Sequence, residues 1–251
     1  MAYSQFSIDA FRANLINGGA RDNLYLVSGV FPGTKQGIIK KTELADFSRP
    51  RATGVNAITI VEGDQLLDAK MTDGKCEIML AVKSGRAIRF PEEKVRPTGR
   101  GAIGVAGIEV DDANDEVVGM ICVNVEDKSR TVLVVSEKGS GKRTQIDEYR
   151  ITNRGGKGVK TISVTEKTGK LVGILDVTES EDLMITCESG ITIRMKIAEI
   201  SEQGRATQGV KLIKLDDDDA IAAITTIAVV SEEEESEEQN NNETPPSTET
   251  N

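Results

Sequence analysis

The sequence predicts an all-β, propeller-like fold of about four four-stranded blades. Two observations lead to this prediction. One pattern occurs four times in the 251 residues, at intervals of 48, 54 and 51 residues. Each copy also holds about four short stretches with the patterning of β-strands, which is typical of a propeller blade.

Each copy of the pattern is anchored at a glycine that precedes a cation by four residues. The anchors are Gly37, Gly85, Gly139 and Gly190, in the segments TKQGIIKK, VKSGRAIR, SEKGSGKR and CESGITIR. An arginine follows each anchor by fourteen or fifteen residues and opens a second glycine-containing segment, RATGV, RGAIGV, RGGKGV or RATQGV. Two landmarks at matched spacing define a structural repeat.

Three kinds of short apolar stretch in each repeat predict its strands. The runs LYLV, IMLAV, TVLVV and LMITC lie before the anchors and are apolar on both faces, as inner strands are. Alternating positions after each glycine-containing segment, such as Val55, Ile58 and Ile60, predict a half-buried strand. The runs LLDA, VVGM, LVGI and IAAI follow turns and predict a further strand. A two-domain β-sandwich is the alternative fold, which the matched repeat disfavours.

The repeats divide the chain into three parts. Residues 1–21 precede the repeats and predict a short helix that Ser7 caps. Residues 22–230 form the predicted domain, with blades at about 22–72, 73–125, 126–178 and 179–230. Residues 231–251 contain eight Glu and no Lys or Arg, so we expect a disordered acidic tail. Because the whole chain has a net charge of −10, the remaining body is nearly balanced, at −2.

Composition excludes several classes of site. The chain has no His, which removes imidazole bases and imidazole zinc ligands. Its three cysteines are far apart and have apolar neighbours, so we expect buried thiols in a reducing compartment. The carboxylates at 216–219 lack the ligand spacing of a calcium loop. We therefore expect no metal and no cofactor. Without a long apolar run, we also expect no membrane contact and a soluble, cytoplasmic protein.

Positive charge recurs at the same two places of every repeat. The first place is the strand after the anchor, and the second is the arginine of the glycine-containing segment. A rim of evenly spaced cations is the footprint of a protein that follows a phosphate backbone, although exposed or cross-blade ion pairs are the alternative. The chain has few aromatic side chains, so duplex DNA bound through phosphates is favoured over stacked single strands. The predicted DNA-binding residues are Lys40, Lys41, Arg49, Arg51, Arg86, Arg89, Arg96, Arg100, Lys142, Arg143, Arg150, Arg154, Lys157, Lys160, Arg194, Lys196, Arg205 and Lys211.

One glycine-containing segment resembles a known signature. The residues Thr152, Asn153, Arg154, Gly155, Gly156, Lys157 and Gly158 match five of the seven positions of the box Q-[RK]-R-G-G-[RK]-G of the DNA gyrase A protein. The segments KKTELADFSRPR, GDQLL, GSGKRT, VTEKTG and GRATQGV extend the resemblance over roughly 34–230. The sequence thus resembles the C-terminal DNA-wrapping domain of that protein, although the family has more blades and places its box in the first of them.

The resemblance implies a β-pinwheel that binds and wraps duplex DNA and contributes to negative supercoiling. It also implies the gyrase B protein and the catalytic core as partners, an ATP-dependent type IIA topoisomerase as the parent enzyme, and a nucleoid-associated location. We expect no catalysis by this chain alone, because Tyr3, Tyr25 and Tyr149 lack the surroundings of the family's catalytic tyrosine. The alternatives are the corresponding C-terminal domain of topoisomerase IV and a propeller used as a protein-binding scaffold.

Overall fold

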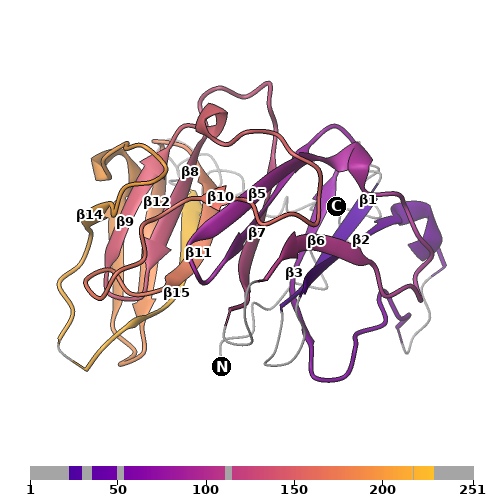
Figure 1. The fold of residues 1–251 in the computed structure, drawn as a ribbon, viewed down its shortest axis with the longest axis horizontal. Helices are drawn as coiled ribbons and strands as arrows, with labels where there is room; N and C mark the ends of the chain where they lie inside the picture. Colours follow the sequence, from indigo (N-terminus) through magenta and orange to yellow (C-terminus); the bar gives the residue numbers. More distant parts are fainter. Residues whose placement is uncertain (1–22, 30–35, 50–53, 111–114, 217, 229–251) are drawn as a thin grey trace, which may run out of the picture.

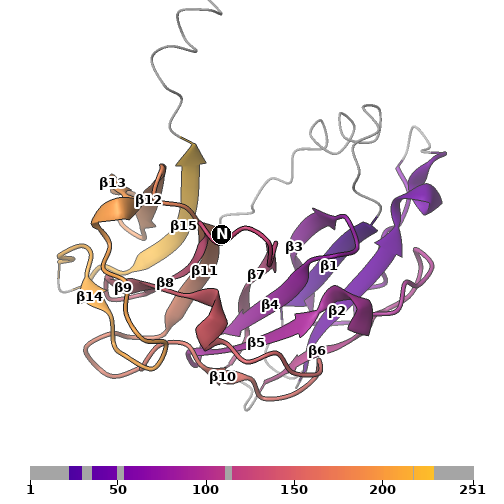
Figure 2. The ribbon, with the colours of Figure 1, turned by 90° about the horizontal axis from the view of Figure 1, so that it is seen from above.

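The computed structural model describes residues 23–29, 36–49, 54–110, 115–216 and 218–228. These residues form four antiparallel sheets that stand in an arc (Figure 1; Figure 2). The all-β, propeller-like prediction is confirmed. The described helical segments are four short 3₁₀ turns, and none of them is long and apolar enough to cross a membrane. The predicted helix in 1–21 and the predicted disordered tail at 231–251 lie outside the described residues.

The first sheet has the order β3-β1-β2-β6, with β1 (Asn23–Gly29), β2 (Gln36–Glu43), β3 (Gln65–Thr72) and β6 (Val105–Glu109). The second has the order β10-β5-β4-β7, with β4 (Glu77–Val82), β5 (Arg86–Pro91), β7 (Val117–Val123) and β10 (Val159–Lys160). The third has the order β11-β8-β9-β14, with β8 (Thr131–Ser136), β9 (Ser140–Thr144), β11 (Leu171–Val177) and β14 (Val210–Lys211). The fourth has the order β13-β12-β15, with β12 (Glu181–Cys187), β13 (Thr192–Lys196) and β15 (Ile221–Ala228).

Neighbouring repeats exchange a strand. In each of the first three sheets, the outermost strand (β6, β10 or β14) comes from the repeat that follows the other three strands. The sheets therefore cross the blade boundaries predicted from the repeats. This exchange supplies backbone partners to the edge of each hairpin, which would otherwise be a free sheet edge.

The strands predicted after the glycine-containing segments are shorter than expected. Only β6 runs over most of the predicted length, whereas β10 and β14 have two residues each. The chain bends here because the backbone amides of Thr161 and Ile162 both donate to the carbonyl of Gly85, at the turn of the preceding hairpin. The strand predicted at Val55, Ile58 and Ile60 is wrong, because 54–61 pairs with no sheet among the described residues.

A glycine with positive φ immediately precedes each exchanged strand. Gly104, Gly158 and Gly209 have φ values of 109°, 72° and 79°. A Cβ on Gly104 would lie 2.7 Å from the Ile39 carbonyl oxygen, and one on Gly209 would lie 2.6 Å from the Gly141 carbonyl oxygen. Close backbone contact and positive φ thus both require glycine at this position.

Three hydrophobic cores lie between consecutive sheets. In β4, Ile78 and Leu80 belong to the core against the first sheet, whereas Met79 and Ala81 belong to the core against the third sheet. The side chains of β8 alternate in the same way. Val132 and Val134 belong to the core against the second sheet, whereas Leu133 and Val135 belong to the core against the fourth. This burial on two faces explains why the predicted inner runs are continuously apolar.

The strands β3, β7, β11 and β15 line a central cavity of about 1010 Å³. Figure 2 shows the arc from above, with the sheet of β13 at one end and the sheet of β1 and β2 at the other. The outermost strands β10 and β14 lie on the opposite side of their sheets from this cavity. The repeats therefore present the glycine-containing segments along the outer edge of the arc.

Candidate nucleic-acid interface

Lys40 and Lys142 occupy the same position of the first and third repeats, and both are buried. The Lys40 Nζ donates to the backbone carbonyl of Arg100 (3.1 Å). The Lys142 Nζ donates to the carbonyl of Gly204 and to the hydroxyl of Thr207 (3.1 Å). Burial lowers the pKa of both lysines, that of Lys142 to about 8. Both lysines were predicted to contact DNA; in the structure they are buried, and each holds the glycine-containing segment of the next repeat.

Arg89 is also a structural residue. Its side chain is 6% exposed and forms an ion pair with Glu77 within its own sheet. Its guanidinium donates to the carbonyls of Ile146 (2.7 Å) and Tyr149 (3.0 Å), which belong to the next repeat. The sequence predicted Arg89 to bind DNA, whereas the structure gives its buried guanidinium three partners within the protein.

Lys41 and Arg143 occupy the same position in their repeats and are likewise buried. The Lys41 Nζ lies 3.0 Å from the carboxylate of Glu92. Arg143 donates from Nε to the carbonyl of Ile200 (2.8 Å) and pairs with Glu179 (2.8 Å). Both were predicted as rim cations, and both form the cross-blade ion pairs that were the alternative.

Arg194 is the fourth member of this set, and it differs in exposure. Its side chain is 54% exposed, although it pairs with Asp182 at 2.6 Å, as Arg89 pairs with Glu77. Its strand, β13, is the edge of the fourth sheet in the described part of the chain, so no following repeat covers it.

Arg154 and Arg205, in the glycine-containing segments of the third and fourth repeats, lie on the outer edge and are half-buried. Arg154 donates from NH1 to the carbonyl of Ala106 (3.0 Å), and Arg205 donates from NH1 to the carbonyl of Lys160 (2.9 Å). Ala106 and Lys160 are equivalent, because each follows the valine that opens an exchanged strand. A guanidinium has five donors, so these contacts use only part of each group.

Two further predicted arginines are half-buried as well. Arg100 is half-buried and lines a hollow with Asn56. Arg86 is half-buried too, and its NH2 lies 4.0 Å from Asp115 Oδ2. Arg51 lies outside the described residues.

The box-like segment 152–158 is one of three equivalent inter-blade segments. The amide of Thr152 donates to the carbonyl of Arg89 (2.8 Å), and Thr98 and Gln203 make the matching contact in the neighbouring repeats. Further on, the amide of Gly155 donates to the carbonyl of Gly107 at 2.6 Å. The segment is thus fixed to the preceding repeat by its backbone, which leaves the side chain of Lys157 exposed.

The remaining predicted cations are exposed. They are Arg49, Arg96, Arg150, Lys157, Lys160, Lys196 and Lys211. Two exposed neighbours were not predicted: Lys94, whose carbonyl accepts from Arg154 Nε (3.2 Å), and Lys138, whose carbonyl accepts from Lys211 Nζ (2.7 Å). Neither recurs at its place in the other repeats, so the repeat pattern carried no signal for them.

Carboxylates lie among these cations. Glu109 is 3.9 Å from Lys157, and Glu148 accepts from the backbone amide of Arg205 (2.8 Å). Exposed pairs of this kind contribute little to stability and are screened by salt. The outer edge therefore presents spaced cations rather than a uniform positive surface.

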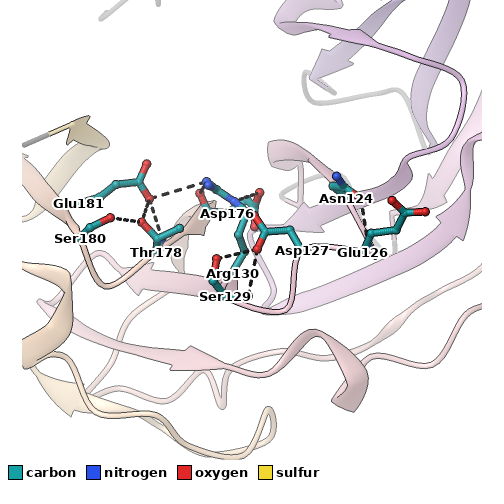
Figure 3. A network of polar contacts seen from close by, with 9 residues as sticks. All are labelled: Asn124, Glu126, Asp127, Ser129, Arg130, Asp176, Thr178, Ser180 and Glu181. Carbon is teal, nitrogen blue, oxygen red and sulfur yellow. Dashed lines mark hydrogen bonds and ion pairs between the residues drawn. The ribbon is translucent and has the colours of Figure 1, made fainter.

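A separate polar network joins the third and fourth sheets near the cavity (Figure 3). Arg130 pairs with Asp176 (2.6 Å) and lies 3.7 Å from Glu181, which also accepts from the amide of Thr178 (2.6 Å). Burial raises the pKa of Asp176. Figure 3 also shows Asp127 and Ser129 beside Arg130 on the same turn. This arginine was not predicted, and it connects sheets rather than facing the outer edge.

Comparison with known proteins agrees with the repeats. A family model described as the DNA gyrase C-terminal domain, beta-propeller, matches residues 33–73, 77–124, 130–178 and 181–228. The DNA gyrase A protein of Staphylococcus aureus strain MRSA252 is 46% identical over 184 residues, and that of strain NCTC 8325 is equally similar. The match covers 73% of this chain but only 20% of each of these relatives.

Two solved structures share the fold. A C-terminal domain of DNA topoisomerase IV superimposes with a TM-score of 0.74 at 21% identity, over 82% of this chain and 62% of that one. A DNA gyrase A C-terminal domain superimposes with a TM-score of 0.69 at 26% identity, over 82% of this chain and 66% of that one. Four matched repeats and the identity to gyrase A proteins give one conclusion: the chain belongs to the family of DNA gyrase C-terminal domains, the propeller domains of type IIA topoisomerases.

Proposed function

We propose that this chain binds duplex DNA along the outer edge of the arc and serves as the DNA-wrapping module of DNA gyrase. Joined to the catalytic core and to the gyrase B protein, it contributes to ATP-dependent negative supercoiling, and the protein is associated with the nucleoid. The observation that supports this proposal most is the matched placement of Arg154 and Arg205. Each donates to the equivalent backbone carbonyl of the preceding repeat, so two repeats present a cation in the same way.

Phosphate contacts made in this way carry no sequence information. We therefore expect binding to duplexes of unrelated sequence with similar affinity. The exposed lysines 157, 160 and 211 extend the positive positions from one repeat to the next. A duplex that follows them must bend, so contacts on consecutive repeats offset the cost of bending.

The test is a titration of two unrelated duplexes over a series of salt concentrations. The logarithm of the association constant should fall against that of salt by about 0.9 for each neutralised phosphate, and about four to eight contacts are expected. Replacing Lys157 and Lys160 with Ala should reduce that slope. The control is Lys70→Ala, on β3 at the cavity, with a side chain 45% exposed. A protein-binding scaffold would show no salt-sensitive affinity for DNA, and that result would overturn the proposal.

A further inference from the structure

The last sheet has an open edge in the part of the chain that the structure describes. Among the described residues, β13 pairs only with β12, whereas β2, β5 and β9 each also pair with an exchanged strand. The residues of β9 are all buried, and four of the six in β5 are, but β13 alternates between exposed and half-buried. Next to β13, the apolar side chain of Ile191 is 53% exposed. Within the described residues, the last sheet therefore lacks the cover that the exchanged strand gives its equivalents.

The first repeat contains a segment equivalent to the exchanged strands, and an exchanged strand is what the last sheet lacks among the described residues. Residues 54–58 are the counterpart of β6, β10 and β14, and Gly54 has the same positive φ, 78°. Nothing in the described chain lies within 4 Å of a Cβ placed on Gly54, whereas Gly104 and its equivalents contact a carbonyl there. In the same described residues, neither Val55 nor Asn56 makes a backbone hydrogen bond.

The observed exchanges fix the register that this segment would take. The valine after the glycine pairs with the second residue after the anchor: Val159 with Ala87, and Val210 with Gly141. The next residue pairs with the first residue after the anchor. In the fourth repeat this rule places Val55 opposite Thr192 and Asn56 opposite Ile191.

We propose that residues 54–58 of one copy of this chain bind β13 of a second copy, so that copies associate head to tail. A second copy is the occupant because the two features lie at opposite ends of the arc (Figure 2). Pairing within one copy would require the arc to close on itself. The contact joins two different surfaces, so it continues from copy to copy as a heterologous interface.

Arg194 gives this association a second contact. Arg89 donates to the carbonyl of Tyr149, and Arg143 donates to the carbonyl of Ile200, each in the following repeat. Phe47 is the equivalent residue of the first repeat. In the associated pair, the exposed guanidinium of Arg194 therefore lies at the Phe47 carbonyl of the second copy. The association is independent of DNA and is measured without it.

Disulfide cross-linking between two single-cysteine substitutions tests the register. Asn56→Cys and Ile191→Cys are made in separate chains, mixed and oxidised without DNA. The mixture should give about tenfold more cross-linked dimer than either variant alone, since a disulfide forms only between Cα atoms about 5.5 Å apart. Mixing each variant with the unmodified chain controls for Cys76, Cys122 and Cys187, which are free thiols.

Two outcomes would overturn the proposal. The first is equal cross-linking in the mixture and in the single variants. The second is a chain carrying both substitutions that forms only an intrachain disulfide, which would show that the arc closes on itself. Sedimentation provides a measurement without added cysteines. The average mass should rise with concentration, and Thr192→Pro, which removes an edge donor, should abolish that rise, whereas Ile103→Asp, at an exposed position in another repeat, should not.

Discussion

Lys142 and Thr207 form a hydrogen bond of 3.1 Å between Nζ and Oγ1, which joins the third repeat to the fourth. In the preceding pair of repeats the equivalent residues are Ile88 and Gly156, and a Cβ on Gly156 would lie 3.7 Å from the Ile88 Cδ1. The fold therefore accepts either a polar pair or an apolar pair at this junction. The buried lysine fastens one repeat to the next.

The lowered pKa of Lys142 predicts a pH-dependent stability. Its pKa is about 8 in the folded chain and 10.5 ordinarily, so between these values the unfolded chain binds more protons. The contribution of Lys142 to the free energy of unfolding should therefore rise from pH 8 to pH 10, by at most about 1.4 kcal/mol per pH unit. Denaturant titrations of Lys142→Met should show less of this rise. Parallel pH profiles of the two proteins would contradict the prediction.

Arg89 and Arg194 offer a matched pair for stability. Arg89→Ala leaves Glu77 buried without its guanidinium, so we expect a loss of about 3–5 kcal/mol in the free energy of unfolding. Arg194→Ala breaks the same kind of pair at an exposed side chain, so we expect about 0–1 kcal/mol. Urea denaturation measures both. A similar loss of unfolding free energy in the two variants would show that burial does not determine how much each ion pair contributes to stability.

Gly158 and Gly54 offer a second matched pair. Both have positive φ, so an alanine at either position introduces backbone strain. The Cβ of Gly158→Ala would also contact the carbonyl of Ala87, whereas that of Gly54→Ala would meet open space. We expect Gly158→Ala to lower the free energy of unfolding by about 1–3 kcal/mol more than Gly54→Ala does. Thermal denaturation at low protein concentration checks this, and equal melting temperatures would contradict it.

The acidic tail yields a prediction that depends on the proposed DNA binding. Eight carboxylates in residues 231–251 are tethered to a domain with exposed cations, so they compete with phosphate at high effective concentration. Deleting these residues should tighten duplex binding, most strongly at low salt, where screening is weak. Titrations with and without the tail measure the effect. Equal affinities at low salt would mean that the tail does not compete.

The sequence predicted the repeats and the inner strands, but it could not show which repeat completes each sheet. Val55 and Val105 have the same pattern, yet only Val105 pairs with a neighbouring sheet in the described chain. Pairing across repeats is set by the packing of whole sheets, which local alternation does not encode. The half-buried strand predicted at Val55 was wrong for this reason.

The same limit explains the outcome for the predicted cations. Arg89 and Arg154 both belong to sets of cations that recur at fixed positions of the repeats. Recurrence alone does not distinguish a buried cation that connects two repeats from an exposed cation that is free to bind a ligand. The strand exchange places the next repeat over Arg89, whereas Arg154 stays half-buried on the outer edge. Exposed Lys94 has no counterpart in the other repeats, so a search for repeated charge could not identify it.

Plasmid relaxation by a separate topoisomerase tests the proposed DNA-binding edge most directly. The plasmid is relaxed with this chain bound, deproteinised, and resolved on a topoisomer gel. Bending costs several kcal/mol, and four repeats supply fewer contacts to offset it than the five or six of the family. We therefore predict that this chain alone binds DNA with only a small shift in linking number. Arg154→Ala with Lys157→Ala should reduce that shift about as much as Arg205→Ala with Lys160→Ala. A large shift that disappears only in the first of these variants would contradict the account and identify residues 152–158 as a wrapping element in their own right.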